Sequence, residues 1–297
     1  MTGTVITIVG STDSRVRQEA EAIIRAAGGQ VSGADVLHEG RAFDLFLPEW
    51  DEGLTARLRE GLAALAGVDV FVQPDDGNRR KKLLLADMDA TMVRQETLDE
   101  LAEHLNIKDD VATITQAAMR GEIGFEESLH RRVRLFKGLD VSALDVTLKT
   151  LDYSAGAEAL IATLRHAGVT CVLVSGGFDM FTAEVARHLG FNRHFGNRLE
   201  IIDGKLTGNV IPPILGKAAK AEYLMAEAAA LGCDLAATAA VGDGANDVPM
   251  LEQAGAGIGH FGKPAVLAAT PHQIRHTDLT AILYMQGYRE SEIQGLS

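Results

Sequence analysis

Two aspartates, Asp87 and Asp89, stand one residue apart behind three leucines and an alanine, in the stretch KKLLLADMDAT at 81–91. A short, unbroken apolar run of this kind is typical of a strand that is buried on both faces. Side chains two residues apart in an extended chain point to the same side, so the two carboxylates can act together. Ligands of open α/β folds bind at the carboxyl edge of the sheet, so we predict that this pair does chemistry there.

Two more apolar runs end in polar residues. The first, 169–174, leads into Ser175-Gly176-Gly177, and the second, 237–241, leads into the loop GDGAND at 242–247. Between them, a long helix contributes Lys220. Each signal is weak alone, because D-x-D pairs arise by chance and a GDG triplet is usually a turn. Their common position at strand ends makes the combination specific.

The acidic residues of these loops suit a divalent cation. Mg²⁺ prefers carboxylate oxygens, with waters and substrate phosphates completing its octahedral shell. We assign Asp87, Asp89 and Asp243 to the metal site. Asp247 follows one helical turn after Asp243 and is placed to orient the metal-bound waters from a second layer.

The same residues predict phosphate-ester chemistry. A carboxylate such as Asp87 can be phosphorylated, which splits hydrolysis into two displacements, while Lys220 screens the repulsion between nucleophile and phosphate. The second carboxylate, Asp89, would protonate the leaving alkoxide and later deprotonate water, a role that needs a raised pKa. The Ser175 hydroxyl and the Gly176 N–H suit the phosphoryl oxygens, because glycine lets the backbone approach closely.

The sequence resembles the haloacid dehalogenase (HAD) superfamily of aspartate-nucleophile phosphohydrolases, whose four motifs match DMDAT, SGGF, the helix lysine Lys220 and GDGAND. A closer similarity, to the phosphoserine phosphatases, is carried by QETLDEL at 95–101, FEESL at 125–129, RRV at 131–133, NRL at 197–199 and GDGANDVPM at 242–250. The resemblance covers residues 82–286. It implies Mg²⁺-dependent hydrolysis of O-phospho-L-serine to L-serine and phosphate through an aspartyl-phosphate, the last step of serine biosynthesis.

The resemblance also implies roles for residues outside the four signatures. Glu96 would meet the substrate ammonium, Arg132 its carboxylate, and Asn246 another part of the substrate. Without the resemblance, Glu96 and Arg132 would each be interpreted as a solvated surface charge, and Phe125 as a core residue as readily as a pocket wall. One position departs from the family pattern: Ala90 replaces the usual serine, which removes a hydroxyl near the phosphate or the cap hinge.

Two other functions stay open on these residues. The same core could act on another small phosphomonoester, namely phosphohomoserine, phosphothreonine or a sugar phosphate. The chain could instead be an amino-acid-sensing protein with a vestigial phosphatase core. The intact set of reactive residues argues against that second function; it consists of Asp87, Asp89, Ser175, Lys220 and Asp243.

The order of apolar segments predicts two domains. Residues 1–78 follow the order βαββαβ of a ferredoxin-like sandwich, similar to ACT-like domains, and residues 79–297 form an α/β domain of the HAD type. A helical cap at about 93–153 is inserted after the first core strand, and β and α then alternate, which predicts a parallel sheet covered on both faces. The polar stretch 73–82, QPDDGNRRKK, is predicted to be a linker whose charges face solvent.

Composition narrows the class of protein. The formal charge of −13 argues against nucleic-acid binding, since a phosphate backbone requires a basic surface. No apolar run approaches the roughly 20 residues that span a bilayer, and no export signal is visible, so we expect a cytoplasmic enzyme with no membrane partner. The two cysteines lie in apolar segments and are expected to be packed rather than paired. A homodimer and an amino-acid ligand on residues 1–78 are left open.

Overall fold

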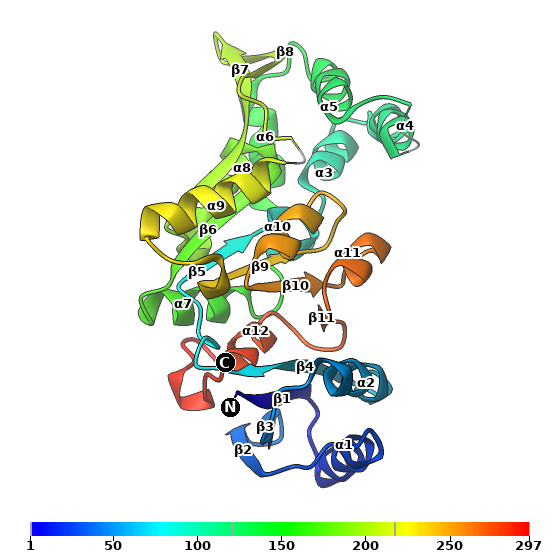
Figure 1. Cartoon of the computed structure of the whole chain (residues 1–297). Helices are drawn as coiled ribbons and strands as arrows, with labels where there is room; N and C mark the ends of the chain where they lie inside the picture. Colours follow the sequence, from blue (N-terminus) through cyan, green and yellow to red (C-terminus); the bar gives the residue numbers. More distant parts are fainter. Residues whose placement is uncertain (1, 120–121, 217, 297) are drawn as a thin grey trace.

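Two β-sheets organise the chain (Figure 1). The computed structural model describes residues 2–119, 122–216 and 218–296. A four-stranded sheet is formed by the N-terminal residues and a seven-stranded sheet by later ones. The overall α/β architecture therefore agrees with the prediction.

The N-terminal module, defined here as residues 2–78, contains the smaller sheet and its helices. Its elements are β1 (Gly3–Gly10), α1 (Ser14–Ala26), β2 (Gly33–His38), β3 (Ala42–Leu47), α2 (Glu52–Leu62) and β4 (Val68–Asp75). This is the predicted βαββαβ order, and the strands are arranged as β2-β3-β1-β4 with every neighbouring pair antiparallel. Ile6 and Ile8 of β1 point to the face that packs on α1 and α2.

The other face of this sheet is covered by the C-terminal part of the chain. Helix α12 (Ala281–Met285) packs against β1 (Figure 1). Val9 and Phe71 of the sheet belong to the same buried apolar cluster as Tyr284. Because both faces are covered, every residue of β1 between its two end glycines is buried.

The larger sheet has the strand order β11-β10-β9-β5-β6-β7-β8. Its strands are β5 (Leu83–Ala86), β6 (Thr170–Phe178), β7 (Arg193–Ile202), β8 (Lys205–Ile211), β9 (Thr238–Gly242), β10 (Ala256–His260) and β11 (His272–Ile274). Neighbouring strands are parallel except β7 and β8, which form an antiparallel hairpin. Asp203 and Gly204 turn this hairpin with φ of 50° and 74°, and Asp-Gly is a typical sequence for such a tight turn. The predicted parallel sheet is thus confirmed.

Strand β5 lies at the centre of the sheet and is buried on both faces. Leu83 and Leu85 pack with α9 (Ala219–Leu231), α10 (Val248–Gln253) and α11 (Pro264–Ala269). Leu84 and Ala86 pack on the opposite face with α7 (Ala157–His166) and α8 (Asp179–Leu189). The prediction of a doubly buried strand is correct, whereas α11 and β11 were not predicted.

The helical insert lies at one end of the larger sheet, beside the β7–β8 hairpin (Figure 1). Its helices are α3 (Thr97–His104), α4 (Lys108–Met119), α5 (Phe125–Arg134) and α6 (Leu144–Lys149). The chain leaves the core and returns to it side by side, because Val93 and Tyr153 form a β-bridge. The Gly138 N–H donates to the Leu206 carbonyl at 2.7 Å, which joins the insert to the hairpin. We call residues 93–153 the cap.

Cys171 is buried in β6 and Cys233 is half-buried, and both are free thiols. Across the part of the chain that the structure describes, none of the helices is long and apolar enough to cross a membrane.

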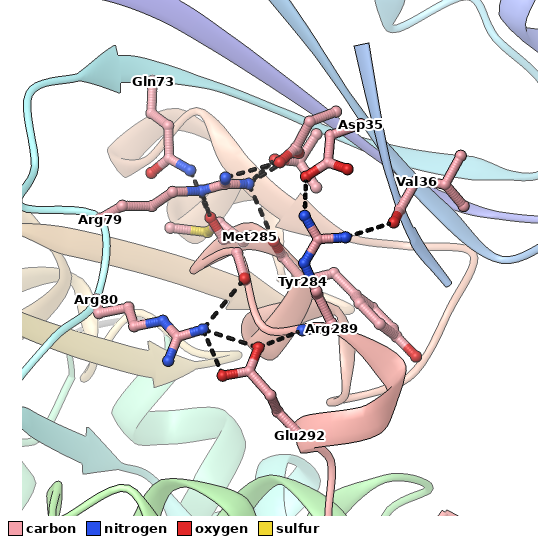
Figure 2. Close-up of polar contacts among 12 residues, drawn as sticks. Asp35, Val36, Gln73, Arg79, Arg80, Tyr284, Met285, Arg289 and Glu292 are labelled. Carbon is pink, nitrogen blue, oxygen red and sulfur yellow. Dashed lines mark hydrogen bonds and ion pairs between the residues drawn. The ribbon is translucent and has the colours of Figure 1, made fainter. Parts of the chain in front are cut away.

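A polar network holds the N-terminal module to the C-terminal segment (Figure 2). Arg79 donates to both carboxylate oxygens of Asp44, at 2.7 and 2.8 Å, and its side chain is only 15% exposed. It also donates to the Met285 carbonyl at 2.8 Å. The prediction that the charges of 73–82 face solvent is therefore wrong for Arg79. Asp44 on β3 is 1% exposed, and a buried carboxylate requires a cation.

We predict that Arg79→Met lowers the free energy of unfolding by about 3–5 kcal/mol, because Asp44 would be left buried and unpaired. Arg80→Met is the matched control. Its ion pair with Glu292 is largely exposed, so we expect a loss of about 0–1 kcal/mol. Urea unfolding followed by circular dichroism measures both values. Equal losses in the two variants would contradict the prediction.

Candidate active site

The predicted reactive loops meet at the carboxyl edge of the larger sheet. Asp87 follows β5, Ser175 lies in β6 and Asp243 follows β9. These three strands are direct neighbours in the order β9-β5-β6. The Asp87 N–H still donates to the Val241 carbonyl of β9 at 3.0 Å, so the sheet itself fixes where the first carboxylate stands.

Lys220 of α9 lies between two buried carboxylates. Its Nζ is 2.6 Å from Asp87 Oδ1 and 2.5 Å from Asp247 Oδ1. All three residues are at most 4% exposed. Burial and the neighbouring Asp247 raise the pKa of Asp87 well above its ordinary value, although Lys220 opposes this shift. Lys220 therefore balances two charges that would otherwise repel each other.

Asp247 also fixes the shape of the GDGAND loop. Its Oδ2 accepts the N–H of Asp243 at 3.0 Å and of Gly244 at 2.9 Å. Gly242 lies so close that an added Cβ would be 2.4 Å from Asp247 Cγ. Asn246 is at the cavity wall, and its Nδ2 is 3.3 Å from Asp247 Oδ1. Asp247 thus acts on the position of Asp243 through the backbone.

Asp89 is held by hydrogen bonds from both sides of the site. Its Oδ2 accepts the Ser175 hydroxyl at 3.0 Å, and its Oδ1 accepts the N–H of Thr97, the first residue of α3, at 2.8 Å. Burial raises the pKa of Asp89 even though these donors favour the charged form. A raised pKa is what the proton-donor role requires.

Ala90 stands at the bend where the chain leaves the sheet for the cap. Its φ is 52°, in the left-handed region, which costs a residue with a Cβ about 1–2 kcal/mol. The Ala90 N–H donates to the Gln95 carbonyl at 3.1 Å, and its own carbonyl lies 3.3 Å from His260 Nδ1. The effect of the missing serine hydroxyl on cap closure stays a prediction.

A cavity of about 220 Å³ lies between the sheet edge and the cap. Glu96, Phe125 and Arg132 line it from the cap, together with Leu98 and Leu129. Across from them, a Cβ added to Gly176 would be 3.6 Å from the Phe125 ring, so the cap closes directly over the glycine turn. The cap and core residues predicted to bind substrate therefore share one cavity.

Asn197 is a supporting residue to which the sequence assigned no role of its own. It is fully buried, its Nδ2 donates to the Gly176 carbonyl at 2.8 Å, and its Oδ1 accepts the Leu215 N–H at 2.8 Å. These two bonds set the orientation of the glycine turn. The NRL segment that contains Asn197 was part of the family resemblance, which was the one available signal.

Arg132 is a cation for which the described residues supply no acidic partner at contact distance. Within the described ranges, its one direct contact is a hydrogen bond from Nε to the Ser128 carbonyl at 3.3 Å. Burial lowers the pKa of Arg132, while Asp99 and Glu96 act in the opposite sense from farther away. A half-buried guanidinium that lacks a carboxylate partner is suited to bind an anionic group of a ligand.

Lys263, in the loop after β10, was missed as a site residue. Its Nζ is 2.9 Å from Asp243 Oδ2 and 3.4 Å from Glu96 Oε1, so it connects the core to the cap. Burial would lower the pKa of Lys263, but its bond to Asp243 raises it overall. No site residue was predicted in the glycine-rich segment GIGHFGKP at 257–264, which contains Lys263. The available signal was the position of this segment after an apolar strand, because the same position identified the other candidate loops.

The donor set fits a divalent cation. Oxygens of Asp87, Asp243 and Asp247 lie within 4.8 Å of one another. Asp89, which was predicted as a ligand, is not in this group, and its carboxylate accepts hydrogen bonds from Ser175 and Thr97. Among the described residues in and directly behind the cavity, acidic side chains outnumber basic ones, which favours a divalent cation. They are Asp87, Asp89, Glu96, Asp243 and Asp247, against Arg132, Lys220 and Lys263.

The fold and the site define a class of enzyme. The model of the haloacid dehalogenase-like hydrolase family matches residues 84–252, more than half of the chain. The chain belongs to this family of hydrolases, as the loops at the strand ends predicted.

Individual relatives extend the comparison. The chain is 38% identical over 290 residues to the phosphoserine phosphatase of Streptomyces coelicolor, across 97% of this chain and 67% of that protein. A HAD family hydrolase from Salmonella enterica serovar Typhi is similar in structure, with a TM-score of 0.86 and 29% identity, over 95% of this chain and 98% of that one. A structure of a phospho-aspartyl intermediate analogue of phosphoserine phosphatase is 40% identical, with a TM-score of 0.64, over 69% of this chain and 98% of that one.

We predict that Lys263→Met strengthens Mg²⁺ binding about 3- to 10-fold. The variant removes a positive charge 2.9 Å from Asp243, and solvent screening keeps the gain modest because the lysine side chain is 53% exposed. Isothermal titration calorimetry with Mg²⁺ measures the change. The control is Lys82→Met, an exposed lysine that does not line the cavity. Unchanged or weaker binding in Lys263→Met would count against the idea that this lysine competes with the cation.

Proposed function

We propose that the protein hydrolyses O-phospho-L-serine to L-serine and phosphate. The observation that carries the proposal is that Arg132 and Glu96 both line the cap side of the cavity. A phosphorylated amino acid presents a carboxylate, an ammonium and a phosphate, and it needs a cation, an anion and a phosphate cradle in one site. Relatives named phosphoserine phosphatases support the assignment.

The core residues supply the first displacement. Asp87 Oδ1 is held by Lys220 and by the Met88 N–H at 2.8 Å, which leaves Oδ2 to attack phosphorus. The bond from phosphorus to the seryl oxygen breaks, and Asp89 gives its proton to that oxygen. Serine leaves, and the phosphoryl group stays on Asp87. The Ser175 hydroxyl and the Gly176 turn border the same cavity and would bind the phosphoryl oxygens.

The second displacement releases phosphate. Asp89, now charged, takes a proton from water, whose oxygen attacks phosphorus as the bond to Asp87 breaks. Lys220 and the Met88 N–H again stabilise the carboxylate that leaves. Mg²⁺, held by Asp87 and Asp243, would supply the charge that offsets nucleophile and phosphate. The phospho-aspartyl analogue of a 40% identical relative supports this two-step route.

Other phosphomonoesters are the main alternative substrates. Phosphate release from phosphoserine, phosphothreonine, phosphohomoserine and sugar phosphates, each with and without Mg²⁺, tests the proposal. Phosphoserine should have the highest kcat/KM, and its turnover should stop without the metal. A sugar phosphate as the best substrate would overturn the amino-acid assignment, and an absence of turnover would favour the sensing protein with a vestigial core.

We predict that Asp87→Asn lowers kcat at least about 10⁴-fold, because an amide cannot form the phosphorylated intermediate. Asp89→Asn should cost about 10²–10⁴-fold, the usual contribution of a general acid and base. Single-turnover kinetics would separate the two variants, because the covalent phosphoryl intermediate should not form in Asp87→Asn. Substantial activity in Asp87→Asn would exclude the proposed nucleophile.

Arg132→Ala is expected to lower kcat/KM for phosphoserine about 10- to 150-fold, the cost of losing a charge-assisted bond. The loss should be much smaller for phosphoethanolamine, which keeps the ammonium and the phosphate but lacks the carboxylate. Arg131→Ala is the neighbouring control, because Arg131 is exposed and paired with Glu127. Equal losses on both substrates would remove the carboxylate-binding role from Arg132.

We extend the proposal to the setting of the enzyme. It would act in the cytoplasm, in the last step of serine biosynthesis, with residues 1–78 as an ACT-like domain and 79–297 as the catalytic one. We also propose that the first domain binds an amino acid and that the chain forms a homodimer. Serine titration and sedimentation of the full chain test these two points.

A further inference from the structure

A second cavity, of about 260 Å³, lies where the N-terminal module meets the core. Its wall includes Trp50 and Arg59 from the module, Lys81 from the connecting segment and His272 from β11. None of the residues assigned to catalysis, substrate or metal lines it. It is therefore a separate space that the phosphatase reaction does not use.

Two polar residues of the wall are already committed to other partners (Figure 2). The Arg79 guanidinium donates to Asp44 and to the Met285 carbonyl. The Gln73 amide donates to the same carbonyl at 2.5 Å. Both side chains point toward the C-terminal segment, so neither is available to an occupant of the cavity.

Two other cations of the wall lack a carboxylate partner among the described residues. Arg59 donates to the Val72 carbonyl at 3.0 Å, and Lys81 donates to the carbonyls of Asn78 and Ala236 at 2.7 and 2.8 Å. Backbone carbonyls satisfy hydrogen bonds but do not neutralise charge. In a chain with a formal charge of −13, two half-buried cations left unneutralised in one cavity require an explanation.

His272 adds a buried ring nitrogen for which the described residues supply no partner. Its Nδ1 is buried without a hydrogen bond, and its ring lies against Phe71 with centroids 6.1 Å apart. Burial, together with the charges of Arg59 and Lys81, lowers the pKa of His272 to about 3, so the ring is neutral. A buried polar nitrogen without a partner typically costs about 1–3 kcal/mol, which a ligand oxygen would recover.

The negative charge of the wall is small. Asp76 is the one carboxylate among its lining residues. It lies at the exposed side, where its Oδ1 accepts the Asn78 N–H at 2.9 Å. Three basic side chains of the wall, Arg59, Arg79 and Lys81, therefore outnumber its one carboxylate, and Trp50 also lines the cavity. Sites for small molecules typically measure about 300–1,000 Å³, so this one suits a ligand of a few heavy atoms.

We propose that this cavity is a binding site for a small dianion with oxygen acceptors, such as phosphate or a short dicarboxylate. Arg59 and Lys81 supply the two charges, and His272 donates a hydrogen bond in the tautomer that carries the proton on Nδ1. The occupant would touch the module and the core at once, because Lys81 leads directly into β5. Binding would therefore raise the unfolding temperature of the whole chain.

The chain contains a single tryptophan, Trp50, which makes the test direct. The full-length enzyme is titrated with potassium phosphate and, separately, with potassium malonate, at constant ionic strength maintained with potassium chloride. We expect a saturable change in tryptophan emission with at least one of the two anions, and an increase in unfolding temperature with the same anion. The two titrations distinguish a phosphate site from a dicarboxylate site.

Variants assign the signal to the cavity. Arg59→Met and Lys81→Met should each weaken binding at least about tenfold, the effect of losing a charge-assisted contact. Lys82→Met is the matched control, because this neighbour is exposed and does not line the cavity. All three variants should keep the basal phosphatase activity. The absence of a saturable signal, or equal affinity in all variants, would overturn the proposal and identify the cavity as a solvent-filled space.

Discussion

The ion pairs of Lys220 with two buried carboxylates are the interaction on which the catalytic site depends. Asp87 and Asp247 are nearly excluded from water, so their like charges would repel each other strongly. The Lys220 ammonium lies between them and offsets the cost of burying both. Asp247 can then hold the N–H of Asp243, which places that carboxylate beside Asp87. One lysine on α9 thus supports the proposed nucleophile, the loop of Asp243 and the geometry between them.

The residues proposed for reaction and those proposed for recognition lie on opposite sides of the cavity. The core supplies the carboxylates and the glycine turn from neighbouring strands, where the sheet allows little movement. The cap supplies Glu96 and Arg132, and it is joined to the core where its entering and leaving segments pair at Val93 and Tyr153. Lys263 contacts an acidic residue on each side, so it connects the charge of the loop that carries Asp243 to the position of the cap.

The N-terminal module is attached by packing as well as by the chain. A four-stranded sheet with helices on one face leaves its other face apolar, and here α12 covers it. Asp44 on that face needed a cation, and Arg79 supplies it from the segment that connects the two parts. Because that segment continues into β5, the contacts that hold the module also anchor the strand that carries Asp87.

The sequence by itself determined the features that rest on local pattern. An apolar run followed by aspartates placed β5 and Asp87, and the same rule placed Ser175 and Asp243. Only the tertiary structure decided the pairings between distant segments. It brought Lys263 to Asp243, grouped the carboxylate of Asp247 with those of Asp87 and Asp243, and turned Arg79 inward. Hydrophobic periodicity records which face of an element is buried, whereas the partner of a buried charge depends on strand order and on the shape of the space that remains.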